Sequence, residues 1–280
     1  MSLEKIDKTN LFQSSNGIFY SKKSTKISYP EDGNKKFSQI EDNSYWFKHR
    51  NDILIPLIKS LIKEKHFIDI GGGNGFVSKS LQENDINVTL IEPGRSGVQN
   101  AQERGVKNII CATFEDIKFE KDNIIEAVGL FDVIEHINED DNFLKQINEQ
   151  LCDNSYIFIT VPAYNFLSSN EDIDAGHYRR YTLQSLTNLL KKNNFEIKYK
   201  TYFFSFLILP ILLFRTIPSL LGFNKNSKST DKHKKEHKIG NSILMKILDR
   251  VLCFEVRRIR NFKYIPFGSS CLIIGQKKKA

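Results

Sequence analysis

A short stretch near residue 70 has the residue types and spacing of a loop whose backbone a ligand can approach. Residues 67–75 read Phe-Ile-Asp-Ile-Gly-Gly-Gly-Asn-Gly, with Asp69 inside an apolar run that leads to Gly71, Gly73 and Gly75. Glycines leave backbone N–H groups uncovered, and a helix N-terminus adds a dipole that favours an anion. The spacing differs from the G-x-G-x-x-G pattern of dinucleotide-binding proteins. It predicts a tight strand-to-helix turn that binds a ligand.

A second chemical signal is the acidic residue that ends the next apolar run. Residue 91 closes this run, and Glu92 and Pro93 follow it directly. The carboxyl ends of neighbouring parallel strands share one edge of a sheet, so Glu92 is expected next to the glycine loop. A carboxylate there accepts two hydrogen bonds from the hydroxyls of a ribose. A surface glutamate is the alternative, and the placement argues against it.

A third group of candidates lies between residues 164 and 181. Its members are His177, Arg179, Arg180, Tyr164 and Tyr181. Arginine side chains offer forked donors for a phosphate or carboxylate, and an imidazole can accept a hydroxyl proton near neutral pH. This pattern favours a segment that binds a substrate. In the alternative, the two arginines pair with Asp172 and Asp174 and only order the loop.

The elements that position these residues can be predicted from hydrophobic periodicity. Short apolar runs alternate with helical stretches, which predicts βαβ units and a parallel sheet covered on both faces. The expected strands are residues 67–70, 87–91, 108–112, 124–131, 156–161, 195–202 and 270–275, and the expected helices are 45–63, 75–83, 96–104, 140–151, 182–193 and 243–259. Residues 1–44 lack clear periodicity and are expected to form an N-terminal arm.

These ordered motifs resemble those of the class I S-adenosylmethionine-dependent methyltransferases. The resemblance covers residues 40–202 and 266–277, and it implies a seven-strand, mostly parallel sheet that ends in an antiparallel hairpin. Residues 45–202 with 266–280 would then form the catalytic domain. Residues 203–265 would be an insertion between the last two strands, with helical structure of its own.

The resemblance also implies a binding mode for S-adenosylmethionine. The backbone at Gly71 and Gly73 would take its carboxylate, Asp69 or a water would take its ammonium, and Glu92 its ribose. Phe114 would stack on the adenine, although packing into the core is the alternative. The full set of implied cofactor residues is Arg50, Asp69, Gly71, Gly73, Glu92, Pro93, Thr113, Phe114, Glu115 and Phe131.

Two histidines are the candidates for catalysis. The run that ends at Phe131 continues as Asp-Val-Ile-Glu-His136, which matches the family's fourth motif, where methyl group and acceptor meet. His136 could act as a base or position the substrate, or it could simply pack in the fold. His177 belongs to a Gly-His-x-Arg-Arg-Tyr pattern that resembles a methyltransferase subgroup linked to glycan and lipid-carrier pathways. That subgroup implies Tyr164, Arg179, Arg180 and Tyr181 as substrate-binding residues.

The insertion combines an apolar and a basic stretch. Residues 203–214 are almost wholly apolar but too few to span a bilayer, and residues 224–238 contain many lysines. A peripheral anchor on an anionic membrane and a helical subdomain packed on the sheet are both consistent with this pattern. The first ten residues do not resemble a signal peptide, and the four cysteines are scattered. A cytoplasmic protein, in contact with a membrane in the first case, is therefore expected.

The sequence thus predicts methyl transfer from S-adenosylmethionine to a small-molecule, saccharide or lipid-linked acceptor, with oxygen as the expected site. A net charge of +8 is compatible with nucleic acid, but the lysines cluster in one loop and no Asn-Pro-Pro-Tyr or Asp-Pro-Pro-Tyr motif follows the fourth strand. A nucleic-acid or protein methyltransferase and a non-catalytic cofactor-binding regulator remain the alternatives. No residue set indicates a metal, and the sequence does not indicate an oligomeric state.

Overall fold

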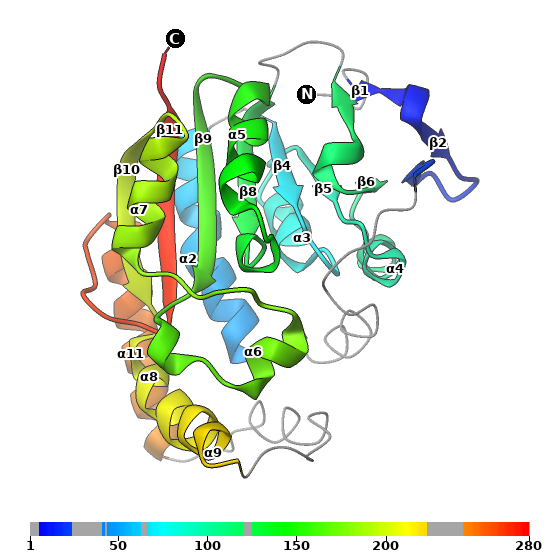
Figure 1. Cartoon of the computed structure of the whole chain (residues 1–280). Coiled ribbons are helices and arrows are strands. Elements are labelled where there is room, and N and C mark those ends of the chain that lie inside the picture. The colour runs from blue at the N-terminus through cyan, green and yellow to red at the C-terminus, as the bar shows by residue number, and fades with distance from the viewer. Residues whose placement is uncertain are drawn as a thin grey trace.

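The computed structural model describes residues 6–23, 41–42, 44–62, 66–119, 125–222 and 243–279. At their centre is a nine-stranded sheet in the order β10-β11-β9-β8-β4-β5-β6-β3-β2 (Figure 1). Its strands are β2 (Leu11–Gln13), β3 (Phe19–Ser21), β4 (Phe67–Ile70), β5 (Val88–Ile91), β6 (Asn108–Cys111), β8 (Ile125–Phe131), β9 (Leu151–Pro162), β10 (Phe195–Phe203) and β11 (Ser270–Lys277). A separate two-stranded sheet pairs β1 (Ile6–Asp7) with β7 (Lys118–Phe119).

The pairing confirms the predicted mixed sheet. Strands β6, β5, β4, β8 and β9 run parallel, and β11 is antiparallel to both β9 and β10. Strand β9 begins earlier than predicted, directly after the preceding helix. The predicted strand count of seven was wrong, because β3 pairs in parallel with β6 and β2 extends that edge. Both extra strands come from the expected N-terminal arm, and each has only three residues, too few to show a periodic pattern.

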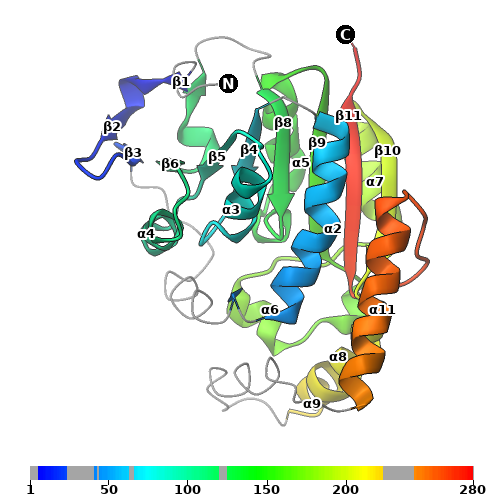
Figure 2. The same cartoon turned by 180° about the vertical axis from the view of Figure 1, so that it is seen from behind.

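Helices cover both faces of the sheet. They are α2 (Tyr45–Ile62), α3 (Phe76–Glu83), α4 (Arg95–Glu103), α5 (Asp140–Gln150), α6 (Asn170–Ala175), α7 (Leu183–Lys192), α8 (Ile208–Ile211), α9 (Ile217–Leu220) and α11 (Ile243–Arg260). Figure 1 shows α5 and α7 in front of the sheet, and Figure 2 shows α2, α3 and α11 on the opposite face. Each face has its own buried core: Leu144 and Leu186 pack on the first, and Leu54 and Leu81 on the second.

The insertion between β10 and β11 is tied to the helix that opens the domain. Its long helix α11 contacts α2, and Glu255 of α11 accepts a hydrogen bond from the His49 ring at 3.0 Å. The backbone N–H of Phe204 donates to the same carboxylate at 3.0 Å. Burial works to raise the pKa of Glu255, but these hydrogen bonds and those from Ser205 outweigh it and lower the pKa. A buried, paired carboxylate thus fixes where the insertion begins.

From Phe204 to Gly222 the chain forms short helical turns at the end of the sheet where β9 finishes (Figure 1). Pro210 lies in α8, and a π-helical turn, η7 (Leu212–Thr216), separates it from α9. Proline removes a backbone donor and so prevents one regular helix here. None of the described helices combines the length and apolar character that a membrane span requires. The lysine-rich residues 224–238 lie outside the described residues.

The turn between β4 and α3 generates a prediction about stability. Gly75 has φ +74°, and a Cβ added there would lie 2.8 Å from the Cβ of Ala101. We expect Gly75→Ala to lower the free energy of unfolding by about 2–4 kcal/mol, from left-handed strain and overpacking together. The control is Gly17→Ala, where φ is +88° but no atom lies within 4 Å, so only the strain of about 1 kcal/mol remains. Equal losses in urea unfolding would contradict this packing argument.

Candidate active site

The glycine loop lies over a buried carboxylate at the end of β4. Gly71, Gly73 and Gly75 all have positive φ, which only glycine adopts without strain. Beneath the loop, the Asp69 carboxylate accepts a hydrogen bond from Ser78 Oγ at 2.7 Å, and its Oδ1 has no hydrogen-bond partner among the described residues. Burial raises the pKa of Asp69 to about 6, although Ser78 and Arg50 work to lower it. One carboxylate oxygen is therefore available to a cation.

Glu92 holds the glycine loop in place. Its Oε2 accepts the N–H of Gly73 at 3.0 Å, and its Oε1 accepts the N–H of Gly94 at 2.7 Å. The predicted ribose-binding residue and the predicted loop are thus brought together. Pro93 follows directly, and its carbonyl oxygen accepts a weak hydrogen bond from the Cys111 thiol of the neighbouring strand. A carboxylate has about four acceptor positions, so one that orders a loop can also accept from a diol.

Arg50 is directed from α2 toward the end of β8. Its Nη1 donates to Asp132 Oδ2 at 2.5 Å, and its guanidinium lies 4.7 Å from the centroid of Trp46 and 5.3 Å from that of Phe47. Its Nε has no hydrogen-bond partner among the described residues. The aromatic cluster before the first parallel strand therefore holds Arg50 at the strand ends. A contact with the cofactor's carboxylate stays a prediction.

The predicted adenine-side residues are divided between the core and the surface. Phe114 packs against Phe119 and Phe143 in the core, which was the alternative to stacking on the adenine. Glu115 is exposed. The hydroxyl of Thr113 is buried without a hydrogen-bond partner among the described residues. These residues lie in and before a short turn, η3 (Phe114–Asp116). Thr113 and Glu115 thus offer polar groups at the end of β6, whereas the ring of Phe114 faces inward.

Phe131 closes β8 with its ring turned toward the core. The ring is almost fully buried and stacks on Phe67 of β4, with centroids 6.3 Å apart and nearly parallel planes. The predicted contact with the cofactor cleft is not tested by this placement. What the placement shows is that the ring packs the end of β8 against the first residue of β4.

A residue just before α2 also reaches the glycine loop, and sequence reasoning missed it. Asn74 Nδ2 donates to Glu41 Oε1 at 2.9 Å, and Arg104 Nη2 donates to Glu41 Oε2 at 2.7 Å. Burial raises the pKa of Glu41, while Asn74, Arg104 and Arg50 work to lower it. Glu41 is a single acidic residue without a motif, and nothing local in the sequence links it to residues 33 positions away.

The predicted acceptor segment forms a closed loop at the end of β9. The N–H of Tyr164 donates to the carbonyl of Tyr181 at 2.8 Å, and the N–H of Tyr181 donates to Pro162 at 3.0 Å, so the two ends of the loop are joined. Tyr164 also stacks on Tyr202 and on Phe166. Tyr181 is buried, its hydroxyl donating to Asp140 at 2.7 Å. Tyr181 therefore anchors the end of the loop in the core, and Tyr164 lies where the loop leaves β9.

The loop brings the two candidate histidines together. Their ring centroids are 4.6 Å apart in an edge-to-face arrangement. His136 closes the turn η4 (Ile134–His136) after β8, and the N–H of Tyr178 donates to the carbonyl of Glu135 at 2.8 Å, which fastens the loop to that turn. Burial, and then the neighbouring His177, lower the pKa of His136 to about 4, against a backbone hydrogen bond at Gly176. His136 is therefore neutral at physiological pH.

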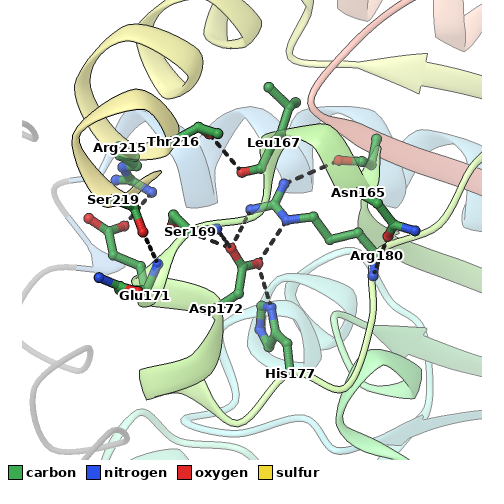
Figure 3. A network of polar contacts seen from close by, with 12 residues as sticks. Asn165, Leu167, Ser169, Glu171, Asp172, His177, Arg180, Arg215, Thr216 and Ser219 are labelled. Atoms are coloured by element: carbon green, nitrogen blue, oxygen red, sulfur yellow. Dashed lines mark hydrogen bonds and ion pairs between the residues drawn. The ribbon is translucent and has the colours of Figure 1, made fainter. Parts of the chain in front are cut away.

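Asp172 organises the acceptor side of the site (Figure 3). Its Oδ1 accepts from His177 Nδ1 at 3.0 Å and from Arg180 Nε at 2.8 Å, and its Oδ2 accepts from Arg180 Nη2 at 3.1 Å. Burial would raise the pKa of Asp172, but these hydrogen bonds outweigh it and hold the pKa well below its usual range. Arg180 thus adopts the loop-ordering alternative. Arg179 instead pairs with Asp140 at 2.9 Å and is about one-third exposed.

One further cluster has the composition of a metal site. Glu135, His136 and His177 each place one ligand atom within 4.8 Å of the others. Sequence reasoning singled out both histidines but not Glu135, because the contact between residues 136 and 177 depends on the path of the acceptor loop.

A model of the methyltransferase domain matches residues 43–200, more than half of the chain. The chain is 30% identical over 146 residues to ubiquinone biosynthesis O-methyltransferase of Rickettsia prowazekii, and 28% identical to that of Rickettsia typhi. These matches cover 45% of the chain and 57% and 58% of the relatives, so the chain spans little more than half of their length. The chain belongs to the methyltransferase-domain family, whose fold and motifs are those of class I S-adenosylmethionine-dependent enzymes.

Solved structures confirm the fold at low sequence identity. A phosphoethanolamine N-methyltransferase of Haemonchus contortus, in complex with S-adenosylmethionine, superposes with a TM-score of 0.56 at 16% identity over 90% of this chain and 58% of that one. A putative methyltransferase of Haloferax volcanii, in complex with its Trm112 activator, gives 0.54 at 13% identity over 89% and 95%. The [4+2]-cyclase SpnF gives 0.55 at 14% identity over 91% and 100%. A cyclase with this fold shows that the fold alone does not determine the reaction.

The raised pKa of Asp69 generates a prediction about cofactor binding. An ammonium group binds the ionised carboxylate, so affinity for S-adenosylhomocysteine should fall as the pH drops through about 6, by up to tenfold per pH unit. Calorimetric titrations between about pH 7 and pH 5 would measure it. Asp69→Asn keeps an acceptor for Ser78 but cannot ionise; it should bind more weakly at pH 7 and show little change with pH. A native affinity that does not change over this range would contradict the role of Asp69.

Proposed function

We propose that this protein transfers the methyl group of S-adenosylmethionine to a hydroxyl oxygen of a small-molecule, saccharide or lipid-linked acceptor. The observation that carries the proposal is the meeting of two groups of residues at one edge of the sheet. Glu92 and the glycine loop end β5 and β4, and His136 with His177 follows β8 and β9. The first pair suits a ribose and an amino-acid tail, and the second suits an acceptor.

On the cofactor side, each group of the ligand has a residue suited to it. The N–H groups of Gly71 and Gly73 already donate to the Ile91 carbonyl and to Glu92, so the loop is proposed to give the amino-acid tail close access to the backbone. Asp69 Oδ1 is proposed to take the ammonium, directly or through a water. Glu92 is proposed to take the ribose hydroxyls, and Thr113 and Glu115 the adenine edge. Arg50 would direct its free Nε to the carboxylate while it keeps its ion pair with Asp132.

On the acceptor side, Arg179 is the better candidate for an anionic group. Its guanidinium is more exposed than that of Arg180, which forms two hydrogen bonds to Asp172. Tyr164 lies at the base of the loop and is proposed to contact the acceptor ring or chain. The curated relatives are O-methyltransferases by name, which supports oxygen as the acceptor atom. A saccharide or lipid-linked molecule with a negative charge would fit these groups.

The reaction we propose is an in-line displacement. The acceptor oxygen forms a bond to the methyl carbon while the carbon–sulfur bond breaks, its electron pair stays on sulfur, and S-adenosylhomocysteine leaves. Alignment of the two reactants in a cleft with little water supplies most of the acceleration. His136 and His177 are proposed to act on the acceptor hydroxyl, whose proton must leave as the bond to carbon forms.

Variants of the two histidines distinguish an enzyme from a protein that only binds the cofactor. With methyl-labelled S-adenosylmethionine and a prenylated catechol or a total lipid extract as acceptor, His136→Ala and His177→Ala should each lower label transfer by about 10²–10⁴-fold. Both should bind S-adenosylhomocysteine within about twofold of the native protein, since neither residue belongs to the proposed cofactor side.

The control for the histidine variants is Tyr178→Phe, an exposed neighbour on the same loop that should transfer label at the native rate. Native protein that binds S-adenosylhomocysteine but labels no lipid or soluble extract would contradict the enzyme and favour the regulatory alternative. Failure to bind S-adenosylhomocysteine at all would contradict the cofactor side as well.

We also propose that the insertion contacts an anionic membrane surface. Five large apolar side chains on its short helical turns are more than half exposed: Leu209 at 65%, Leu213 at 53%, Phe214 at 71%, Leu220 at 80% and Leu221 at 64%. We call these five residues the apolar ridge. The chain continues from the ridge into residues 224–238, which include six lysines against one aspartate and one glutamate. Apolar side chains next to a lysine-rich segment suit a lipid headgroup layer with negative charge.

A vesicle experiment tests this contact. The triple variant Leu213→Ser, Phe214→Ser, Leu220→Ser should reduce co-sedimentation with anionic vesicles by at least about tenfold, because three apolar side chains no longer enter the bilayer. The matched control, Phe254→Ser with Phe267→Ser, removes two comparably exposed aromatic rings elsewhere and should bind like the native protein. Equal binding by the triple variant and the native protein would contradict the ridge as the contact.

A further inference from the structure

A buried carboxylate next to the two histidines lacks a partner. Glu135 is 1% exposed, and neither of its carboxylate oxygens has a hydrogen-bond partner among the described residues. An unpaired buried carboxylate costs several kcal/mol. Arg180 and Arg50 attract its charge, but each forms its ion pair with another residue, Asp172 or Asp132. The site therefore contains a buried carboxyl group that forms no hydrogen bond with any described side chain.

Two imidazoles face the same space from different elements. One ligand atom from each of Glu135, His136 and His177 lies within 4.8 Å of the other two. In a metal site with bonds of about 2.0–2.2 Å, ligand atoms are roughly 3–4 Å apart, so the three side chains need to close by about 1 Å. Side-chain rotations suffice for such a movement.

The tautomer of His177 is already set for a ligand. Its Nδ1 lies 3.0 Å from Asp172 Oδ1, and that carboxylate also accepts hydrogen bonds from Nε and Nη2 of Arg180. Nδ1 must therefore carry the proton, which leaves Nε2 with its lone pair. A carboxylate that orients a histidine in this way is the usual outer partner of a metal-binding imidazole. The same Asp172 is fixed in turn by Arg180 and by the N–H of Ser169.

From this geometry we propose that Glu135, His136 and His177 bind one divalent transition-metal cation, with Asp172 as the outer partner of His177. Two imidazole nitrogens and one carboxylate oxygen favour ions such as Zn²⁺, Co²⁺, Mn²⁺ or Fe²⁺ over Mg²⁺, which prefers oxygen ligands. The cation neutralises Glu135, which no described side chain does. Three protein ligands leave coordination positions open for an exogenous oxygen.

The role of the cation deepens the proposed function and rests on it, whereas the binding of the cation does not. A hydroxyl bound to a divalent cation has a lowered pKa, so it loses its proton to water before or as its oxygen attacks the methyl carbon. The carbon–sulfur bond then breaks with its electron pair on sulfur. In this assignment His136 and His177 act as ligands that place the acceptor oxygen, and neither has to remove the proton.

The test uses the full chain with any affinity tag removed, treated with a chelator and then titrated with Co²⁺. The native protein should bind one equivalent, with the visible absorption bands of nitrogen- and oxygen-bound Co²⁺ and an increase in melting temperature. Glu135→Gln should weaken Co²⁺ binding by at least about 10–100-fold. This variant removes a buried charge without changing shape, so it should fold and bind S-adenosylhomocysteine like the native protein.

A second variant and a control complete the design. His136→Asn should also lose the Co²⁺ bands, and Asp174→Asn, which removes an exposed carboxylate on the same loop, should keep them. Native affinity in Glu135→Gln would overturn the site. So would a native protein that binds S-adenosylhomocysteine but no equivalent of Co²⁺, and methyl transfer could then still proceed without a cation. Loss of S-adenosylhomocysteine binding with Co²⁺ binding intact would contradict the proposed function and leave the metal site standing.

Discussion

The ion pair between Arg50 and Asp132 joins the two halves of the site. Asp132 follows β8 directly, its φ is +59°, and its backbone N–H donates to Thr160 on β9 at 2.9 Å. Arg50 comes from α2 and is held over Trp46 and Phe47. Both side chains are mostly buried, so the loss of either partner leaves an uncompensated charge, at a cost of about 3–5 kcal/mol. Helix α2, on the proposed cofactor side, is therefore fixed to the end of β8, where the proposed acceptor side begins.

Much of this arrangement could be predicted because the signals are local. The apolar runs and the glycines at 71, 73 and 75 determine strand, turn and helix within ten residues, and the parallel sheet then requires that Glu92 lie next to the loop. The N-cap of α7 at Thr182 and the antiparallel pairing of β10 with β11 follow from the same kind of local pattern. The position of Glu92 next to the glycine loop was thus predicted from the sequence, whereas its role toward a ribose stays a prediction.

The parts that escaped prediction depend on contacts between distant segments. The partner of Arg180 is chosen by the fold of the acceptor loop, which turns Asp172 inward while Asp174 stays exposed. Phe114 packs against core rings of other segments, a choice between core and ligand that the sequence left open. The short strands β2 and β3 join the sheet through the pairing of β3 with the edge of β6. A period of two or of 3.6 residues carries no information about such pairings.

The insertion, which lies outside the resemblance, contacts the acceptor loop directly (Figure 3). Thr216 Oγ1 donates to the carbonyl of Leu167 at 3.1 Å, and Ser219 Oγ accepts the N–H of Asn170 at 3.0 Å. Arg215 pairs with Glu171 at 2.9 Å. These contacts reach the first turn of α6, whose capping box includes Asp172, the residue that orients His177. These contacts join the segment that carries the apolar ridge to α6 and, through Asp172, to His177. If the proposed membrane contact and the proposed lipid-linked acceptor both hold, the acceptor would meet a loop that is held by the segment proposed to touch the lipid surface.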